Sequence, residues 1–210
     1  MSSTSPKFTV QANPGTDIWK KPPSTNVWNA PISHTKTGPL ISFRSSRVTF
    51  WAPWTERYDQ GGILLVPRPK TSPACTSSSP APAKWVKIGV ELYQGKPHLS
   101  VVCCDRFADW SCSLPNTPLE DSAGVTFEVT READEHGRSL WVYQLVLDPA
   151  TGEVKERFPL REICWFFADE DEGEKDWILD VSLLVARPEK GVSEPLVVEF
   201  REFDVTWNST

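Results

Sequence analysis

The stretch KWVKIGVELY, from Lys84 to Tyr93, predicts a β-strand with a lysine and a glutamate on one face. Side chains of a strand alternate between its faces, so the apolar residues at positions 86, 88, 90 and 92 are expected to face a core. The opposite face then carries Trp85, Lys87, Gly89 and Glu91. Lys87 and Glu91 would lie about 13 Å apart along the strand, so each needs partners on neighbouring strands. Such a pair could bind a polar ligand, or act as acid and base where burial shifts their pKa values.

A second group of polar residues comes directly before another predicted strand, in YDQGGILLVP. The strand from Gly62 to Val66 is apolar on both faces, which is typical of the centre of a packed sheet. We expect it to pair with the first strand across the Pro/Ser-rich stretch 68–83, which we interpret as a flexible loop. Tyr58, Asp59 and Gln60 would then lie at the rim of the lysine–glutamate face. Asp59 has a second interpretation as a residue that caps the turn before the glycines.

Aromatic and charged side chains elsewhere could complete a ligand site, because rings stack on the C–H face of a sugar while polar groups bind its hydroxyls. The expected ligand-binding set is Gln60, Trp54, Trp85, Lys87, Glu91, Trp110, Tyr143, Arg161 and Trp165. If the protein is an enzyme, the expected catalytic set is Lys87, Glu91, Tyr58 and Asp59. Core packing explains the four tryptophans of the first set equally well. Taken alone, a lysine and a glutamate on a sheet face are most often solvated or form weak cross-strand ion pairs.

Several other chemistries lack the residues they need. We expect no metal site, because the acidic stretch 169–176 does not have the ligand spacing of an EF-hand and no Cys/His spacing suits zinc. The three histidines, His34, His98 and His136, are scattered among predicted turns and none accompanies a nucleophile. No phosphate-binding loop or nucleophile elbow occurs, so we expect no cofactor.

Composition limits the class of protein. The chain has 210 residues, 39% of them hydrophobic, with a net charge of -6 and no basic stripe, so nucleic acid is not an expected partner. The N-terminus does not resemble a signal peptide and the apolar runs are too short to span a bilayer, so we expect a cytoplasmic protein without a membrane partner. Five cysteines, an odd number, favour reduced thiols.

The pattern along the chain is all-β. We expect about ten or eleven strands joined by turns, including one over 161–168, and no helix longer than two turns. The segment 8–31 is interpreted as a short strand followed by Pro/Asn turns, and the stretch DRFADWS as a turn. The apolar first and last strands are expected to pair in one sheet. Such a pattern is typical of a β-sandwich or barrel, here a single domain over 1–210.

Four stretches resemble the DUF1349 family, whose yeast members are named for regulation of enolase: RVTFWAPWTERYDQGGILL, KWVKIGVELYQGKPHLSVV, DRFADWS and VSLLVARP with VVEFREFDV. The resemblance runs from about residue 17 to 207, interrupted by 68–83 and 169–176. It implies an antiparallel two-sheet jelly roll of the concanavalin A-like lectin/glucanase type, with a concave face that often takes carbohydrate. On that fold, the strand with Lys87 and Glu91 would present them on the concave face.

The resemblance leaves the function open among three hypotheses. Glucanases of this type usually carry E-x-D-x-x-E on one strand, and here that strand has only Glu91, so hydrolysis by two carboxylates is not supported. The first hypothesis is a binding protein for a small polar or carbohydrate-like ligand, with a regulatory role toward a metabolic enzyme suggested by the family name. The second is a cofactor-independent isomerase, cyclase or lyase, and the third is a protein–protein interaction module.

Overall fold

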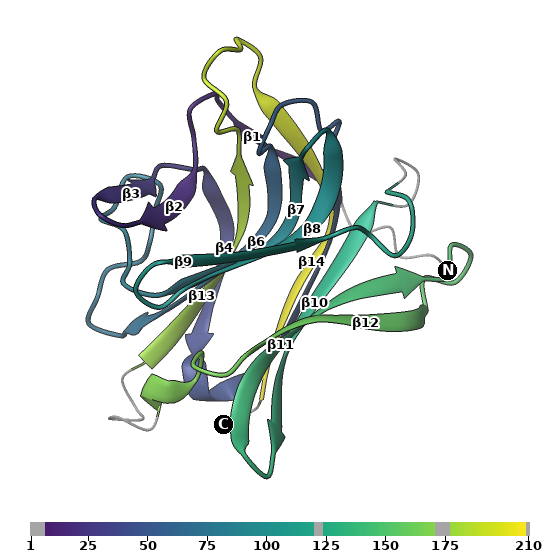
Figure 1. The fold of residues 1–210 in the computed structure, drawn as a ribbon. Helices are drawn as coiled ribbons and strands as arrows, with labels where there is room; N and C mark the ends of the chain where they lie inside the picture. The colour runs from purple at the N-terminus through teal and green to yellow at the C-terminus, as the bar shows by residue number, and fades with distance from the viewer. Residues whose placement is uncertain (1–6, 120–123, 171–176, 209–210) are drawn as a thin grey trace.

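The computed structural model describes residues 7–119, 124–170 and 177–208 (Figure 1). Fourteen strands form within these ranges: β1 (Phe8–Ala12), β2 (Ile18–Lys21), β3 (Thr25–Trp28), β4 (Ile32–Pro39), β5 (Phe43–Trp51), β6 (Gln60–Pro69), β7 (Trp85–Tyr93), β8 (Lys96–Cys104), β9 (Ala108–Ser113), β10 (Val125–Asp134), β11 (Gly137–Leu147), β12 (Val154–Ile163), β13 (Trp177–Ala186) and β14 (Leu196–Trp207). Two short 3-10 helices, η1 (Leu40–Ser42) and η2 (Ala168–Glu170), accompany them.

Two six-stranded antiparallel sheets pack face to face as a jelly-roll sandwich (Figure 1). The first sheet has the order β1-β14-β5-β10-β11-β12, and the second has the order β4-β13-β6-β7-β8-β9. The predicted fold class is therefore confirmed. The expected pairing of the first and last strands is also confirmed, because β1 pairs with β14.

Alternation along the strands builds the core between the sheets. Val86, Ile88 and Val90 of β7 are buried there, as the sequence pattern predicts. The first sheet contributes large rings: Phe50 lies 5.9 Å from Phe127 and 5.6 Å from Phe200, measured between ring centroids. Burial of each such side chain contributes about 1.5–3 kcal/mol.

A second apolar cluster covers part of the outer face of the second sheet. The hairpin β2–β3 lies on this face and contributes Ile18 and Trp28, which pack with Trp85 and its neighbours. The Trp28 indole also donates a hydrogen bond of 2.9 Å to the carbonyl oxygen of Thr76, within the loop between β6 and β7. The hairpin is therefore held both by apolar burial and by the Pro/Ser-rich loop.

Three local expectations differ from the structure, and a fourth is untested. The hairpin β2–β3 occupies the segment interpreted as turns, and β4 follows it, because tertiary packing orders a Pro- and Asn-rich stretch that has little periodicity. DRFADWS opens the edge strand β9 rather than forming only a turn. The expected strand 161–168 is wrong: β12 ends at Ile163 and the chain then turns, so its apolar residues pack as a corner. Most of the acidic stretch, 171–176, lies outside the described residues.

Two further features concern the thiols and the helices of the described residues. All five cysteines are free thiols, as expected. Across the three described ranges, no helix is both long enough and apolar enough to cross a membrane.

A buried ion pair joins the loop before β6 to the end of β13. Arg187 donates to both carboxylate oxygens of Asp59, at 2.9 and 2.7 Å, and also to Thr55 and the carbonyl oxygen of Glu194. Asp59 is fully buried and also accepts from the backbone N–H groups of Thr55 and Glu56. The pair is thus fully hydrogen-bonded, which offsets the cost of burying both charges.

Truncating one partner of this ion pair should strongly destabilise the fold. We expect Arg187→Ala to lower the free energy of unfolding by about 3–5 kcal/mol, because it leaves the Asp59 carboxylate buried without a counter-charge. Denaturant unfolding followed by tryptophan fluorescence measures the change. Lys155→Ala is the control, since its exposed ion pair with Asp148 should contribute under about 1 kcal/mol. Equal effects of the two variants would contradict this account.

Candidate functional site

A pocket of about 260 Å³ opens beside the hairpin on the outer face of the second sheet. Its lining combines charged, amide and aromatic side chains from the hairpin and the residue before it, from the loop before β6, and from β6, β7 and β9: Asp17, Trp19, Lys21, Tyr58, Gln60, Lys87, Glu91 and Trp110. Register explains why the central ones meet, because β6 pairs with β7 so that Gln60 lies opposite Glu91. The expected pairing of these two strands is confirmed.

Lys87 is buried at the centre of a polar network. Its Nζ donates to Gln60 Oε1 at 2.6 Å and to Asp17 Oδ1 at 3.3 Å, and it lies 5.9 Å from the Trp19 ring centroid. The Gln60 amide also donates to Asp17 Oδ1, at 3.3 Å. An ammonium group has three donors, and within the described ranges no acceptor takes the third one. Lys87 therefore retains one donor for a ligand.

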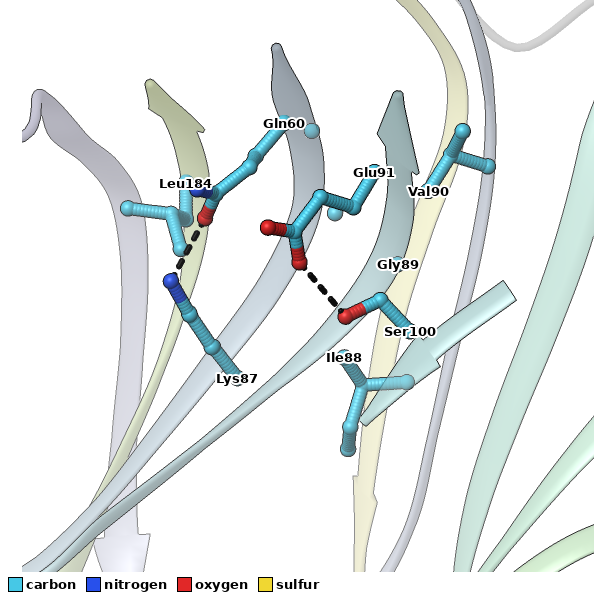
Figure 2. Close-up of a pocket in the computed structure, with 10 residues that line it drawn as sticks. Gln60, Lys87, Ile88, Gly89, Val90, Glu91, Ser100 and Leu184 are labelled. Carbon is cyan, nitrogen blue, oxygen red and sulfur yellow. Dashed lines mark hydrogen bonds between the residues drawn. The ribbon is translucent and has the colours of Figure 1, made fainter. Parts of the chain in front are cut away.

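Glu91 lies two residues beyond Gly89 on the same face of β7 and is also buried. Its Oε2 accepts from Ser100 at 2.9 Å, and Ser100 Oγ in turn accepts from the Trp110 indole at 3.0 Å. Oε1 has no hydrogen-bond partner among the described side chains, and Figure 2 shows it turned toward Gln60 and Lys87. Burial raises the pKa of the Glu91 carboxyl, while the charge of Lys87 and the Ser100 hydrogen bond act in the opposite direction.

Three aromatic rings form the wall of the pocket. Trp19 comes from the hairpin, Tyr58 from the loop before β6 and Trp110 from β9. Tyr58 stacks on Tyr93 at 5.8 Å, and Tyr93 meets Trp110 edge-on at 5.1 Å. Tyr58 adopts a left-handed backbone conformation, φ 66°, that is unusual for a tyrosine. The neighbouring Asp59–Arg187 ion pair holds the loop in this shape.

A smaller cavity of about 10 Å³ lies at the floor, between Lys87, Glu91 and Ser100 (Figure 2). Gly62 and Gly89 face each other beneath it, paired across β6 and β7. A Cβ on Gly89 would collide with the carbonyl oxygen of Gly61, and one on Gly62 with that of Ile88. Close approach of the two strands therefore requires both glycines.

Five expected site residues lie together at this pocket: Tyr58, Gln60, Lys87, Glu91 and Trp110. Their roles toward a ligand remain predictions. Asp59, expected as a candidate catalytic group, is corrected to a structural one, because both its oxygens are taken by Arg187 and the turn. The interpretation of Asp59 as a turn residue accounts for its contacts.

Two tryptophans of the expected ligand-binding set belong to apolar clusters instead. Trp85 is on the predicted face but only 1% exposed, because the hairpin covers its ring. Trp54 packs against the core between the sheets, edge-on to Phe50 at 6.3 Å. Neither presents a ring face to the pocket.

Three further expected residues lie away from the pocket. Tyr143 is on the outer face of the first sheet, where it bonds Glu132 and where Glu132 and burial raise its pKa to about 12. Arg161, on the edge strand β12, bonds Asp109 and Ser111 across the gap to β9. Trp165 packs at the corner after β12, beside Lys84. The sequence placed them on suitable faces of strands, but these strands belong to the other sheet.

Sequence reasoning missed Asp17, Trp19, Lys21 and Ser100. Asp17 directly precedes the hairpin, and Trp19 and Lys21 belong to it. The apolar–polar alternation in DIWKK is too short to distinguish a strand from the surrounding turn residues. Ser100 is opposite Gly89 in the β7–β8 register, so the hairpin signal around QGKP could have placed it beside Glu91.

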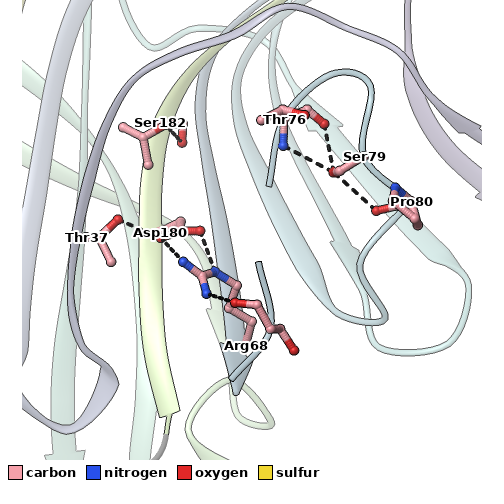
Figure 3. Close-up of polar contacts among 9 residues, drawn as sticks. Thr37, Arg68, Thr76, Ser79, Pro80, Asp180 and Ser182 are labelled. Atoms are coloured by element: carbon pink, nitrogen blue, oxygen red, sulfur yellow. Dashed lines mark hydrogen bonds and ion pairs between the residues drawn. The ribbon is translucent and has the colours of Figure 1, made fainter. Parts of the chain in front are cut away.

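A second polar cluster on the same face secures the loop that supports the hairpin (Figure 3). Arg68 donates to both oxygens of Asp180, at 2.6 and 3.2 Å, and to the carbonyl oxygen of Ser72. Thr37 donates to Asp180 as well, at 2.7 Å. These groups satisfy one another, so the cluster anchors the start of the loop rather than facing a ligand. In the described part of the chain, no group of three or more His, Cys, Asp or Glu side chains could hold a metal ion.

Comparison with known proteins identifies the family. A model described as "Protein of unknown function (DUF1349)" matches residues 1–207. The chain belongs to the DUF1349 family. An uncharacterized protein of Emericella nidulans is 42% identical over 194 residues, which covers 92% of this chain and 83% of the relative.

A solved structure supports the fold of this DUF1349 protein. The crystal structure of a functionally unknown protein from Saccharomyces cerevisiae matches with a TM-score of 0.60 and 18% identity, over 97% of this chain and 89% of that one. A Bacteroides ovatus mixed-linkage glucan GH16 protein in complex with a product matches with a TM-score of 0.46 and 7% identity, over 95% and 94% of the two chains. At such identity the likeness concerns the fold and not the activity.

Glu91 should make folding stability depend on pH with a definite sign. Its folded-state pKa is above the ordinary value of 4.5, so the folded chain holds the proton more tightly than the unfolded chain. Its contribution is therefore fully present below about pH 4.5 and is lost as the pH rises through the folded-state pKa. Relative to Glu91→Gln, the wild type should lose stability over that window, as measured by denaturant unfolding at a series of pH values.

Glu199→Gln provides a control of opposite sign. Its hydrogen bond with Arg201 lowers the Glu199 pKa, so this contribution is present above the ordinary value and is lost as the pH falls through the folded-state pKa. Parallel pH profiles for the two variants would show that Glu91 is not the buried acid described above.

Proposed function

We propose that this protein binds a small, polar, carbohydrate-like ligand in the pocket beside the hairpin. The observation that supports this most directly is the combination of unused polar atoms with aromatic walls. A donor of Lys87 and an acceptor of Glu91 lack protein partners among the described residues, and both side chains line the pocket. A hydrogen bond from a ligand to such a polar group contributes favourably to the binding free energy.

The chemistry of the pocket suits a hydroxylated ring. Hydroxyl groups both donate and accept hydrogen bonds, so one molecule can bond to Lys87 and Glu91 together. Its C–H faces can lie against the rings of Trp19 and Trp110. The volume of about 260 Å³ is near the lower end, about 300 Å³, of typical ligand pockets, which favours a ligand of one or two small rings.

An acid–base enzyme at the same site is the second candidate. The raised pKa of Glu91 beside a buried lysine is the observation that favours it, because perturbed carboxyls are common general acids and bases. The reaction would be an isomerisation, cyclisation or elimination that needs no cofactor. Hydrolysis by paired carboxylates has less support, since Asp59 is engaged by Arg187.

The protein-interaction hypothesis has weaker support from the surface. Among the described residues, the exposed large apolar side chains lie in different strands, loops and a 3-10 helix: Ile41, Phe107, Leu114, Val154 and Val197. Docking surfaces are usually contiguous apolar patches. Regulation of a metabolic enzyme and a cytoplasmic location remain proposals that come from the family resemblance and the composition.

Ligand binding should depend on Lys87 and Glu91. A thermal-shift screen of neutral monosaccharides, sugar phosphates and a metabolite extract should give a hit with wild type. A ligand at a hundred-fold excess over its Kd raises the free energy of unfolding of the protein by about 2.7 kcal/mol. Lys87→Met/Glu91→Gln should abolish the shift, whereas the control Lys155→Met/Glu156→Gln, on the exposed edge strand β12, should keep it. A shift that survives in the pocket variant would place the ligand elsewhere.

Turnover distinguishes the binding protein from the enzyme. Wild type and Glu91→Gln are incubated with each hit, and the mixtures are analysed by mass spectrometry and NMR, which also detects isomers of equal mass. A binding protein returns the ligand unchanged. Product from the wild type that falls by at least about a hundredfold in Glu91→Gln, the usual size of a general acid–base effect, would favour the enzyme instead.

A further inference from the structure

The floor cavity has the size of a single oxygen atom with its hydrogens. Its volume of about 10 Å³ approaches the 10–15 Å³, roughly, that one water requires, and it is far below that of a phosphate or carboxylate group. Gly62, Gly89 and Leu184 line it. The cavity shares Gln60, Lys87 and Glu91 with the larger pocket, so the two adjoin.

The polar groups around the cavity define what fits in it. Lys87 provides the unused donor and Glu91 Oε1 the unused acceptor, and Figure 2 shows the Glu91 carboxylate between Ser100 and the Gln60–Lys87 pair. A hydroxyl group can accept from the first and donate to the second, whereas a phosphate or carboxylate oxygen would meet the Glu91 carboxylate. A buried oxygen needs two to four polar partners, roughly, which this set supplies.

We infer that the floor cavity is a subsite for one hydroxyl oxygen of the ligand, held between Lys87 and Glu91 above the Gly62–Gly89 pair. The ligand is then a neutral polyol or sugar whose inserted hydroxyl is unmodified, rather than a metabolite that inserts a phosphate or carboxylate. This inference rests on the proposed function, because it concerns the same pocket. In the free protein the same position holds one water.

Ser100 allows a matched test, because a Cβ on either glycine would meet backbone. Ser100→Ala and Ser100→Val both lose the hydroxyl that bonds Glu91, but only valine adds volume beside the cavity. High-resolution crystal structures of free wild type and both variants are compared. We expect a water bonded to Lys87 and Glu91 in wild type and Ser100→Ala, and none in Ser100→Val. Ser100→Thr replaces Ser100→Val if circular dichroism shows the latter to be unfolded.

Calorimetric titration with D-glucose, D-galactose, D-mannose and D-xylose tests the ligand. At least one sugar should bind wild type. Its Kd should rise less than about tenfold in Ser100→Ala and more than about tenfold in Ser100→Val. Among the monodeoxy derivatives of that sugar, the one that lacks the inserted hydroxyl should bind wild type at least about tenfold more weakly than the parent sugar.

The outcomes separate this inference from the proposed function. A wild-type crystal without water between Lys87 and Glu91 would overturn the subsite, while the titrations still decide the proposed function. Equal sugar affinity in Ser100→Ala and Ser100→Val would overturn the subsite and leave the binding proposal standing. A cavity water with no sugar binding to wild type would overturn both and leave a structural water site.

Discussion

The packing of the hairpin β2–β3 onto the outer face of the second sheet is the interaction on which the pocket depends. Ile18 and Trp28 bury their side chains against Trp85, and this apolar contact brings Asp17 and Trp19 over Lys87. Without the hairpin, the lysine would lie on an open sheet face, where a charged side chain is solvated and contributes little. Apolar burial on one part of the face therefore creates a desolvated polar site on the next.

The supports of the hairpin form a continuous chain of contacts. Arg68 and Asp180 secure the start of the loop 68–83, and Thr76 of this loop accepts the hydrogen bond of Trp28. On the other side of the pocket, the buried Arg187–Asp59 pair fixes the backbone that presents Tyr58. The charges of these pairs are fully engaged within the protein. The charged residues that the sequence offers as candidates thus form two groups: those engaged in internal ion pairs that support the pocket, and those that line it.

The candidate function follows from this division. Lys87 and Glu91 are buried as residues, and each keeps a hydrogen-bonding atom that no described protein group uses, so these atoms are available to a water or a ligand. Burial raises the Glu91 pKa, so the same arrangement that favours a hydroxylated ligand also favours proton transfer to it. Binding and acid–base chemistry are therefore alternatives for one site, distinguished by turnover.

The sequence by itself determined the all-β class, the β6–β7 pairing and the shared face of Lys87, Gly89 and Glu91, because two-residue periodicity and turn signals are local properties of the chain. The two-sheet sandwich was implied by the family resemblance. It could not determine which sheet a strand joins, so Tyr143 and Arg161 were expected at a face to which they do not belong. It also could not show that Trp85 would be covered or that Asp17 would reach Lys87. Those outcomes depend on contacts between residues far apart in the chain, and only the tertiary structure decides which side chains are desolvated together.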